Sequence, residues 1–347
     1  MTAILVTDKS GCEARFACDP GERILHAGLR AGAALPYDCG TGTCGACRAA
    51  IVDGAVDHLW ADAPGAKRIK SDAEGLMCQM APRADCALKI RTPFSSLTPG
   101  RAPVYRAGEL HLIERLTDEV GVFRLHLDEA APFMAGQFGI VWFDGLDGAR
   151  AYSMTRYDPD ALEHDFLIRA FPGGGASALL FDDDFASARV RVFGPLGKAV
   201  FDPEEGRPFI AIAGGSGVAG MLAILDHAAR ARHFAAHPSA LYFGLRGPDS
   251  AYLLDDLNAR AAEDGLSVSI VFSDSRADAA LRARCPNLAF VDGMVHAVAA
   301  EALQAQPPGP ETLFYVAGPP PMVDAAMRSL VMQLKISPTE IRYDKFG

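Results

Sequence analysis

Short apolar runs in residues 1–97 predict a small mixed sheet with one helix packed on it. Leu25 and Leu29 lie four positions apart within Glu22–Ala31, so both fall on one face of a helix. The strand-length runs around this helix are Ala3–Val6, Ala14–Ala17 and Ala87–Ile90. The first two are close enough along the chain to form a hairpin.

Residues 104–203 carry the alternation that is typical of strands. From Phe123 to Asp128 every second residue is apolar, which is the period of a strand with one buried face. Further strand-length runs are Gly136–Phe143, Ala151–Thr155, Phe166–Phe171 and Val190–Phe193. Because turn residues separate these runs, we expect an antiparallel barrel.

Residues 204–347 alternate between buried strands and helices. The apolar strand-length runs are Phe209–Ala213, Ala240–Gly244, Val268–Ser273 and Leu313–Ala317. Helical stretches follow at Val218–Arg230, Ser250–Ala262 and Pro321–Leu334. This order predicts a parallel sheet covered by helices on both faces.

Charge and proline content divide the chain into three predicted domains. Residues 1–97 hold eleven basic and eleven acidic residues, so the net charge of −10 falls entirely on the rest of the chain. The segment from Thr92 to Pro103 contains three prolines and predicts a linker. We therefore expect domains at 1–97, 98–203 (linker and barrel) and 204–347.

Composition narrows the classes of partner. The chain has 347 residues, of which 50% are hydrophobic and 22% charged, and its acidic balance disfavours nucleic acid or an anionic membrane as a partner. The first ten residues contain no basic run followed by an apolar core, so we expect a cytoplasmic protein. Residues 208–225 carry no charge but include four glycines, which favours a buried strand, turn and helix over a membrane span.

Four cysteines predict a metal centre. The spacing Cys39-x4-Cys44-x2-Cys47, followed by Cys78, is typical of a plant-type [2Fe–2S] cluster. Cys44 and Cys47 alone would also suit a thioredoxin-type pair or half of a zinc site, but neither explains Cys39. A Rieske cluster would need Cys-x-His, which the sequence lacks. We expect the other four, Cys12, Cys18, Cys86 and Cys285, to be small apolar residues.

Further motifs suggest nucleotide binding, although each one alone could be an ordinary turn or strand end. They are Arg150-Ala-Tyr152-Ser153, the glycines of Pro172–Phe181, the Gly-rich stretch Ala213–Gly220, and Ala317–Met322. Glycines before a helix leave free N–H groups that attract phosphate. The third motif contains GxGxxG, but the next strand ends in Phe243-Gly-Leu-Arg246 without the acidic residue of a Rossmann fingerprint.

In this order, the motifs resemble the ferredoxin–NADP reductase superfamily over nearly the whole chain. More narrowly, they resemble the one-chain reductase components of bacterial aromatic-ring oxygenases, such as toluene monooxygenase reductases and the reductases of benzoate or naphthalene dioxygenases. The resemblance implies a β-grasp [2Fe–2S] ferredoxin domain, an antiparallel β-barrel FAD domain and an α/β nicotinamide-binding domain.

The resemblance also implies roles for matching residues. Arg150 would pair with the flavin phosphate, Tyr152 would lie along the isoalloxazine ring, and Ser153 would approach its N5. With Tyr152 and Ser153, the C-terminal Asp344 and Phe346 would form the reacting site. The FAD pyrophosphate would be held by Gly174, Gly175, Ala176 and Ser177. The nicotinamide dinucleotide would be held by Gly215, Ser216 and Gly217, and its nicotinamide would be bordered by Gly318, Pro319 and Met322. Two residues depart from the family pattern, Ala317 for the usual Cys and Gly220 for the usual Pro.

The expected activity is electron transfer from NADH through FAD and the cluster to a terminal oxygenase or its ferredoxin, by a monomer. Asp274 at a strand end would disfavour the 2′-phosphate of NADPH, although Arg246 and Arg276 nearby could favour it and Asp274 could be a solvated turn residue. Two alternatives remain: a reductase of the same build that serves another acceptor, such as a deoxysugar dehydratase, and a pure electron carrier or redox sensor.

Overall fold

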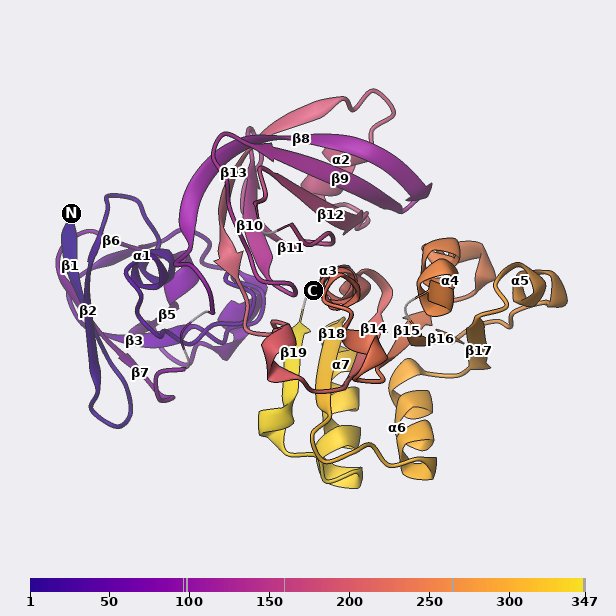
Figure 1. Cartoon of the computed structure of the whole chain (residues 1–347). Coiled ribbons are helices and arrows are strands. Elements are labelled where there is room, and N and C mark those ends of the chain that lie inside the picture. The colour runs from indigo at the N-terminus through magenta and orange to yellow at the C-terminus, as the bar shows by residue number, and fades with distance from the viewer. Residues whose placement is uncertain (96, 98, 159, 264, 346–347) are drawn as a thin grey trace.

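The structure, a computed structural model, describes residues 1–347 except 96, 98, 159, 264 and 346–347. Three large sheets follow one another along the chain and lie side by side in space, and a two-stranded sheet accompanies the first (Figure 1). The predicted fold class is confirmed: a mixed sheet with a helix, an antiparallel near-barrel and a parallel sheet. No helix in the described part of the chain is both long and apolar enough to cross a bilayer.

The first sheet is mixed, with strand order β2-β1-β7-β3-β5. Its elements are β1 (Thr2–Thr7), β2 (Glu13–Cys18), α1 (Ile24–Arg30), β3 (Arg48–Asp53), β5 (Glu74–Leu76) and β7 (Cys86–Ile90). A separate antiparallel pair is formed by β4 (Val56–His58) and β6 (Met80–Pro82). β1 pairs antiparallel with β2 and parallel with β7. The predicted helix face is correct, because Leu25 and Leu29 are both buried.

The second sheet is antiparallel throughout, with strand order β11-β10-β13-β8-β9-β12. Its elements are β8 (Val104–Thr117), β9 (Val120–Leu127), β10 (Phe138–Phe143), β11 (Arg150–Ser153), β12 (Glu163–Arg169), α2 (Gly175–Leu180) and β13 (Ser187–Leu196). A bridge between Met154 and Phe166 brings the two edges of the sheet together. As the alternation predicts, Phe123, Leu125 and Leu127 are buried.

The third sheet is parallel, with strand order β17-β16-β15-β14-β18-β19. Its elements are β14 (Phe209–Gly214), α3 (Val218–Arg230), β15 (Ala240–Leu245), α4 (Leu254–Glu263), β16 (Ser267–Phe272), α5 (Ala279–Arg284), β17 (Leu288–Asp292), α6 (Val295–Ala305), β18 (Leu313–Gly318), α7 (Pro320–Arg328) and β19 (Ile341–Lys345).

Two predicted helices of the third sheet have different bounds in the structure. The helix predicted to begin at Ser250 begins at Leu254, because Pro248–Ser250 forms a 3-10 turn and Leu253 takes a positive φ of 64°. The last helix ends at Arg328 rather than at Leu334, and a π-helical turn, Ser329–Gln333, continues it.

Apolar packing joins the three sheets. Phe138, Ile140, Phe193 and Leu196 of the barrel lie in the same buried cluster as the core of the first sheet. Other barrel residues share a second cluster with β14 and α3. The barrel therefore packs through buried apolar contacts on both sides, against the first sheet and against the third.

Candidate metal centre and cofactor sites

The four predicted ligand cysteines come together as two pairs. Cys39 and Cys44 lie on the loop before β3, and their sulfurs are 3.2 Å apart. Cys47 ends this loop, and its sulfur lies 3.3 Å from that of Cys78 in the short 3-10 helix η2 (Met77–Gln79). Cys39, Cys47 and Cys78 are buried, and Cys44 is half-buried.

The loop backbone is shaped around these sulfurs. Gly40, Gly42 and Gly45 take positive φ values of 66°, 100° and 75°, a region that favours glycine. This curvature turns amides inward: the N–H groups of Thr41 and Cys44 point at the Cys39 sulfur from 3.5 and 3.4 Å. The hydrogen bond to Cys44, together with those from Thr43 and Thr41, lowers the pKa of Cys39 and favours its thiolate, while the same contact raises the pKa of Cys44.

This donor set fits a [2Fe–2S] cluster. Among the described residues no three His, Cys, Asp or Glu side chains are arranged around a single ion. The cysteines instead form two neighbouring pairs, and a binuclear cluster needs two soft thiolates for each of its irons. Amides aimed at the sulfurs are the hydrogen bonds that tune the potential of such a centre.

A large cavity opens between the cysteine loop and the barrel. Its volume is about 960 Å³, within the range of pockets that hold organic cofactors. Cys39 lines it from the first sheet, while Arg150 and Tyr152 of β11 line it from the barrel. The predicted cluster site and the predicted flavin motif therefore face the same space.

The flavin motif is held by its strand and by a turn. Arg150 donates through Nη1 to the Asp147 carbonyl at 2.8 Å, which anchors its guanidinium at the turn 144–148. Tyr152 lies near Phe166, with ring centroids 6.0 Å apart, and burial raises the pKa of its phenol well above the usual value. Ser153 is buried at the end of the strand.

The predicted pyrophosphate loop lies beside the same turn. Gly174, Gly175, Ala176 and Ser177 form the start of the short helix α2, and a Cβ on Gly175 would lie 3.6 Å from Leu146. The Ser177 hydroxyl accepts a hydrogen bond from the Phe171 amide at 2.7 Å, so this side chain closes the loop itself.

A second cavity, of about 510 Å³, lies at the carboxyl edge of the parallel sheet. Of the predicted dinucleotide residues, Gly215, Arg246, Pro319 and Met322 line it. Ser216, Gly217 and Gly318 are not among the residues that line it. Gly217 and Gly318 lie against each other, because a Cβ on Gly217 would lie 2.5 Å from the Gly318 backbone. Open parallel sheets bind ligands at this edge.

Asp274 is not among the residues that line this cavity. Its amide bonds the Arg246 carbonyl at 2.9 Å, and its carboxylate accepts a 2.6 Å hydrogen bond from Ser273, which does line the cavity. The other nearby cation, Arg276, pairs with Asp292 at 3.1 Å.

The two departures from the family pattern lie where the second and third sheets meet. A Cβ on Gly220 would lie 3.6 Å from Ser153, so α3 packs directly against the end of the flavin motif. Ala317 is buried, and its carbonyl touches the backbone of Gly217.

The described C-terminal residues approach the cysteine loop. Asp344 lies on β19 and lines a third cavity together with Asp38, the neighbour of Cys39. Burial, and then the charge of Asp38, raise the pKa of Asp344 to about 7. Phe346 lies outside the described residues.

Several residues of the shared cavity have no signal in the sequence. Arg23, Trp60 and Gln79 line it from three separate segments. His26 is also unpredicted: it is buried, it bonds the Tyr105 hydroxyl of the barrel at 2.8 Å, and its other ring nitrogen lies 3.3 Å from the Gly40 carbonyl. No periodic pattern or spacing connects residues so far apart in the chain.

Comparison with known proteins agrees with this geometry. Residues 7–83 match the family described as 2Fe-2S iron-sulfur cluster binding domain, residues 107–201 the oxidoreductase FAD-binding domain, and residues 211–328 the oxidoreductase NAD-binding domain. The chain is 33% identical over 336 residues to the ferredoxin–NAD(+) reductase component of the alkene monooxygenase system of Xanthobacter autotrophicus, covering 95% of this chain and 97% of that one.

Further relatives share the whole length. A ferredoxin–NAD(P)(+) reductase of Metapseudomonas resinovorans is 31% identical, covering 95% of this chain and 96% of its own. The solved ferredoxin reductase in carbazole 1,9a-dioxygenase superposes with a TM-score of 0.81 at 29% identity, covering 99% of this chain and 98% of that one. The chain therefore belongs to the family of one-chain ferredoxin–NAD(P)+ reductase components of oxygenase systems, and it is an NADH oxidoreductase with FAD and [2Fe–2S] domains.

Proposed function

We propose that this chain delivers electrons from NADH to the terminal component of a ring-hydroxylating oxygenase, or to that component's ferredoxin. The observation that carries the proposal is the 960 Å³ cavity, which both Cys39 and Tyr152 line. When bound, FAD accepts two electrons at once and releases them singly, as a cluster that takes one electron at a time requires.

The proposed task of the barrel residues is to hold and orient the flavin. Arg150 supplies a fixed positive charge for its phosphate, and Tyr152 supplies a flat apolar surface for the ring. Gly174, Gly175, Ala176 and Ser177 offer amides to the pyrophosphate. Two observations support this task. Arg150 and Tyr152 line the cavity that reaches the cysteine loop, and the loop that begins α2 lies against the turn 144–148, part of which lines the same cavity.

The residues of the third sheet are proposed to present the nicotinamide to the flavin. Gly215, Ser216 and Gly217 would hold the dinucleotide, while Gly318, Pro319 and Met322 would border its reacting end. The contact of Gly220 with Ser153 supports this arrangement, because it brings the start of α3 against the flavin motif. Asp344 and Phe346 are proposed to border the reacting site, and Arg246 and Asp274 to face the adenosine ribose.

The cysteine assignment tests the proposed route. Cys47→Ala removes one of four thiolates, so we expect the iron–sulfur visible absorption and the cluster-dependent dye reduction to be lost. Ferricyanide, which takes electrons directly from the flavin, should still be reduced. Cys285→Ala, at a buried cysteine of the third sheet, is the matched control and should keep its iron. Unchanged iron content in Cys47→Ala would refute the assignment.

Two alternatives receive less support. The FAD- and NAD-binding matches speak against a bare electron carrier or sensor. Two of the relatives named above belong to a monooxygenase and a dioxygenase system according to their names, which favours an oxygenase over a deoxysugar dehydratase as the acceptor. Co-purification of the chain with the oxygenase that it reduces would decide between them.

We also propose that the chain acts as a monomer in the cytoplasm. None of the eight cysteines forms a disulfide, which is the usual state in a reducing compartment. Sedimentation of the purified holoenzyme at several concentrations tests the monomer, and a mass that rises with concentration would contradict it.

A further inference from the structure

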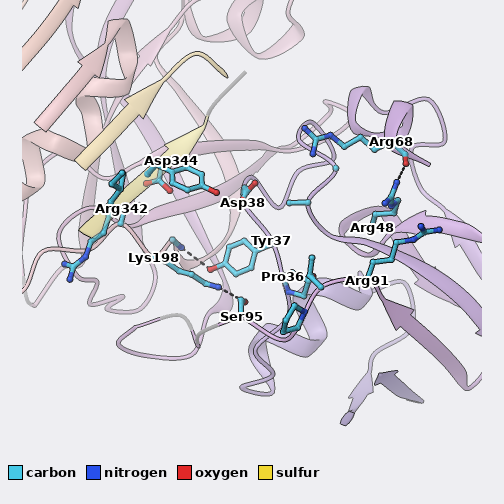
Figure 2. A pocket seen from close by; sticks show the side chains of 18 residues that line it. Pro36, Tyr37, Asp38, Arg48, Arg68, Arg91, Ser95, Lys198, Arg342 and Asp344 are labelled. Atoms are coloured by element: carbon cyan, nitrogen blue, oxygen red, sulfur yellow. Dashed lines mark hydrogen bonds between the residues drawn. The ribbon is translucent and has the colours of Figure 1, made fainter. Parts of the chain in front are cut away.

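A third cavity borders the cysteine loop from another side. It measures about 640 Å³ and is walled by the loop residues Gly45 and Ala46, by 197–199 after the barrel, and by 341–344 of β19 (Figure 2). It shares no lining residue with the 960 Å³ cavity proposed to hold the flavin. The cavity therefore offers a second approach to the cluster loop, one that does not pass through the proposed flavin site.

Positive charge gathers along one wall of this cavity. Figure 2 shows three arginines of the first sheet region on the same side, Arg48, Arg68 and Arg91. Two further cations are close to Arg68 in the sequence, although they do not line the cavity: Lys67 precedes it, Lys70 follows two residues later, and both are exposed. We call these five residues the basic face. It is a local excess, because residues 1–97 are neutral as a whole and the chain carries a net charge of −10.

Acidic side chains neutralise this face only in part. Glu74 accepts from Arg91 at 2.8 Å and lies 3.9 Å from Arg48, so one buried carboxylate serves two guanidinium groups. The cations elsewhere in the cavity are already engaged: Arg342 is paired with Glu205 at 2.6 Å, and Lys198 donates to Ser95 at 2.6 Å. Asp38 and Asp344 also line the cavity, on the side of Lys198 and Arg342 (Figure 2), and within the described part of the chain neither forms an ion pair with the three arginines. The arginine wall next to the cysteine loop therefore keeps an excess of positive charge.

Arg68 connects this charge to the cluster loop. A Cβ on Gly45 would lie 2.8 Å from Arg68 Cδ, so the arginine stem lies directly on the residue after Cys44. Its exposed guanidinium makes no ion pair within the described part of the chain. The guanidinium of Arg68 can therefore pair with an acidic group of another protein, while its aliphatic stem contacts the loop that carries the cysteines.

We propose that the basic face is the docking site for an acidic segment of the electron-accepting protein. This inference rests on the proposed function and names the surface through which electrons leave. Opposite charges steer two proteins together and select their orientation, which here would bring the acceptor to the cluster loop. Because salt screens charges beyond about 8 Å, the local face outweighs the distant net negative charge. With its cluster bound and reduced, the chain would give up one electron to the oxidised centre of the acceptor at each docking, and two dockings would use the pair supplied by one NADH.

The test measures binding and electron transfer in the holoenzyme. A fluorescein-labelled peptide of eight glutamates reports binding by anisotropy, and an acidic plant-type [2Fe–2S] ferredoxin reports electron transfer. Arg68→Glu should weaken peptide binding and slow reduction of the ferredoxin by about tenfold each, and should flatten their dependence on salt. Reduction of cytochrome c, a cationic acceptor, should become faster.

The matched control is Arg15→Glu, a reversal of the same charge in the same part of the chain. Arg15 is exposed on β2, at the opposite edge of the sheet from β5, and its partner is Glu13 at 2.8 Å. The cluster spectrum is recorded for every variant. If Arg68→Glu does not hold its cluster, Lys67→Glu on the same turn replaces it.

The outcomes separate this inference from the function on which it rests. The docking site would be refuted if Arg68→Glu and Arg15→Glu had equal effects, or if peptide binding did not depend on salt concentration. Neither result would contradict the proposed electron route. A cluster that NADH cannot reduce would instead refute the proposed function. Peptide binding does not depend on electron transfer. It therefore tests the basic face even if NADH cannot reduce the cluster.

Discussion

Among single residues, Arg150 is the sharpest test of the flavin site. It faces the shared cavity from the turn 144–148, and its proposed contact is a charge-assisted hydrogen bond to phosphate. We expect Arg150→Ala to cost about 1.5–3 kcal/mol in FAD binding, which is roughly a ten- to hundredfold rise in the dissociation constant. Flavin released on dilution is measured by fluorescence. Arg189→Ala, at an exposed arginine of β13, should retain its flavin, and full retention by Arg150→Ala would contradict the role.

A second residue, His164, links the stability of the barrel to pH. It is buried, its Nε2 lies 2.8 Å from the Ala131 carbonyl, and burial lowers its pKa to about 4. Below pH 6.5 the unfolded chain binds a proton at this residue and the folded chain does not, so stability is lost as the pH falls. This histidine therefore makes the free energy of unfolding about 1.4 kcal/mol lower at pH 5.5 than at pH 7.5.

Denaturant unfolding at the two pH values checks this prediction. In His164→Gln the difference in unfolding free energy between pH 7.5 and 5.5 should shrink by that amount. His58→Gln, at an exposed histidine of β4, should leave the difference unchanged. The same pH dependence in parent and His164→Gln would show that another group is responsible.

Residues that form a local pattern could be predicted from the sequence, and residues that meet only in the fold could not. The spacing of Cys39, Cys44 and Cys47 reflects the reach of one loop, so it identifies three ligands directly. Trp60 and Arg23 line the same cavity from other segments, where no repeat or glycine marks them. Their position depends on how the first sheet packs on the barrel, which no short stretch of sequence encodes.

Among the elements, helix α3 has two glycines near its start whose surroundings differ sharply. A Cβ on Gly220 would meet only ordinary contacts, the nearest at 3.6 Å, whereas one on Gly217 would lie 2.5 Å from backbone atoms of residues 317 and 318. We expect Gly220→Ala to raise the unfolding free energy by about 0.5–1 kcal/mol, because alanine favours the helix.

Gly217→Ala is the matched counterpart. Its φ of −61° suits alanine, so any loss of stability comes from the clash alone. We expect a lower melting temperature and weaker NADH binding, because the loops 214–217 and 317–322 must separate. Thermal unfolding and a nucleotide titration of both variants check the pair. Equal melting temperatures would contradict the close contact.

Elements with clear periodicity were predictable, and those without it were not. β9 alternates strictly and was predicted, whereas β8, the longest strand, has mostly half-exposed side chains and therefore shows no clean pattern. The start of α4 was placed too early because its apolar residues continue back through a turn that Leu253 bends away from the helix. Periodicity identifies a buried face but gives no account of a local backbone turn.

For the whole molecule, the contact between the first sheet and the barrel should control electron transfer. Phe193 is fully buried there, stacked on His26 at 4.5 Å and tilted against Tyr105 at 4.7 Å. Phe193→Ala should cost about 3–5 kcal/mol and slow reduction of the cluster relative to reduction of the flavin. Stopped-flow mixing with NADH follows the two steps at separate wavelengths.

Phe123→Ala is the control at equal size and burial. Phe123 lies in the barrel's other core cluster, against Phe181 and Phe185, away from the first sheet. Its loss should lower stability by a similar amount while leaving the ratio of the two rates unchanged. The same slowing in both variants would mean that barrel stability, rather than the contact with the first sheet, limits the transfer.

The apolar cluster shared by the first sheet and the barrel also restricts how such chains can be recombined. A chimera that exchanged residues 1–97 for a related segment would set a foreign surface against Phe138, Ile140 and Leu196, and Gly40 of the cysteine loop already comes close to Ile140. The linker would tolerate the new connection between the two segments. Most foreign N-terminal segments, however, would not pack well against these barrel residues. We therefore expect an active chimera only when the barrel face and the cysteine loop are taken together from the same donor protein, so that the two would be inherited as one unit.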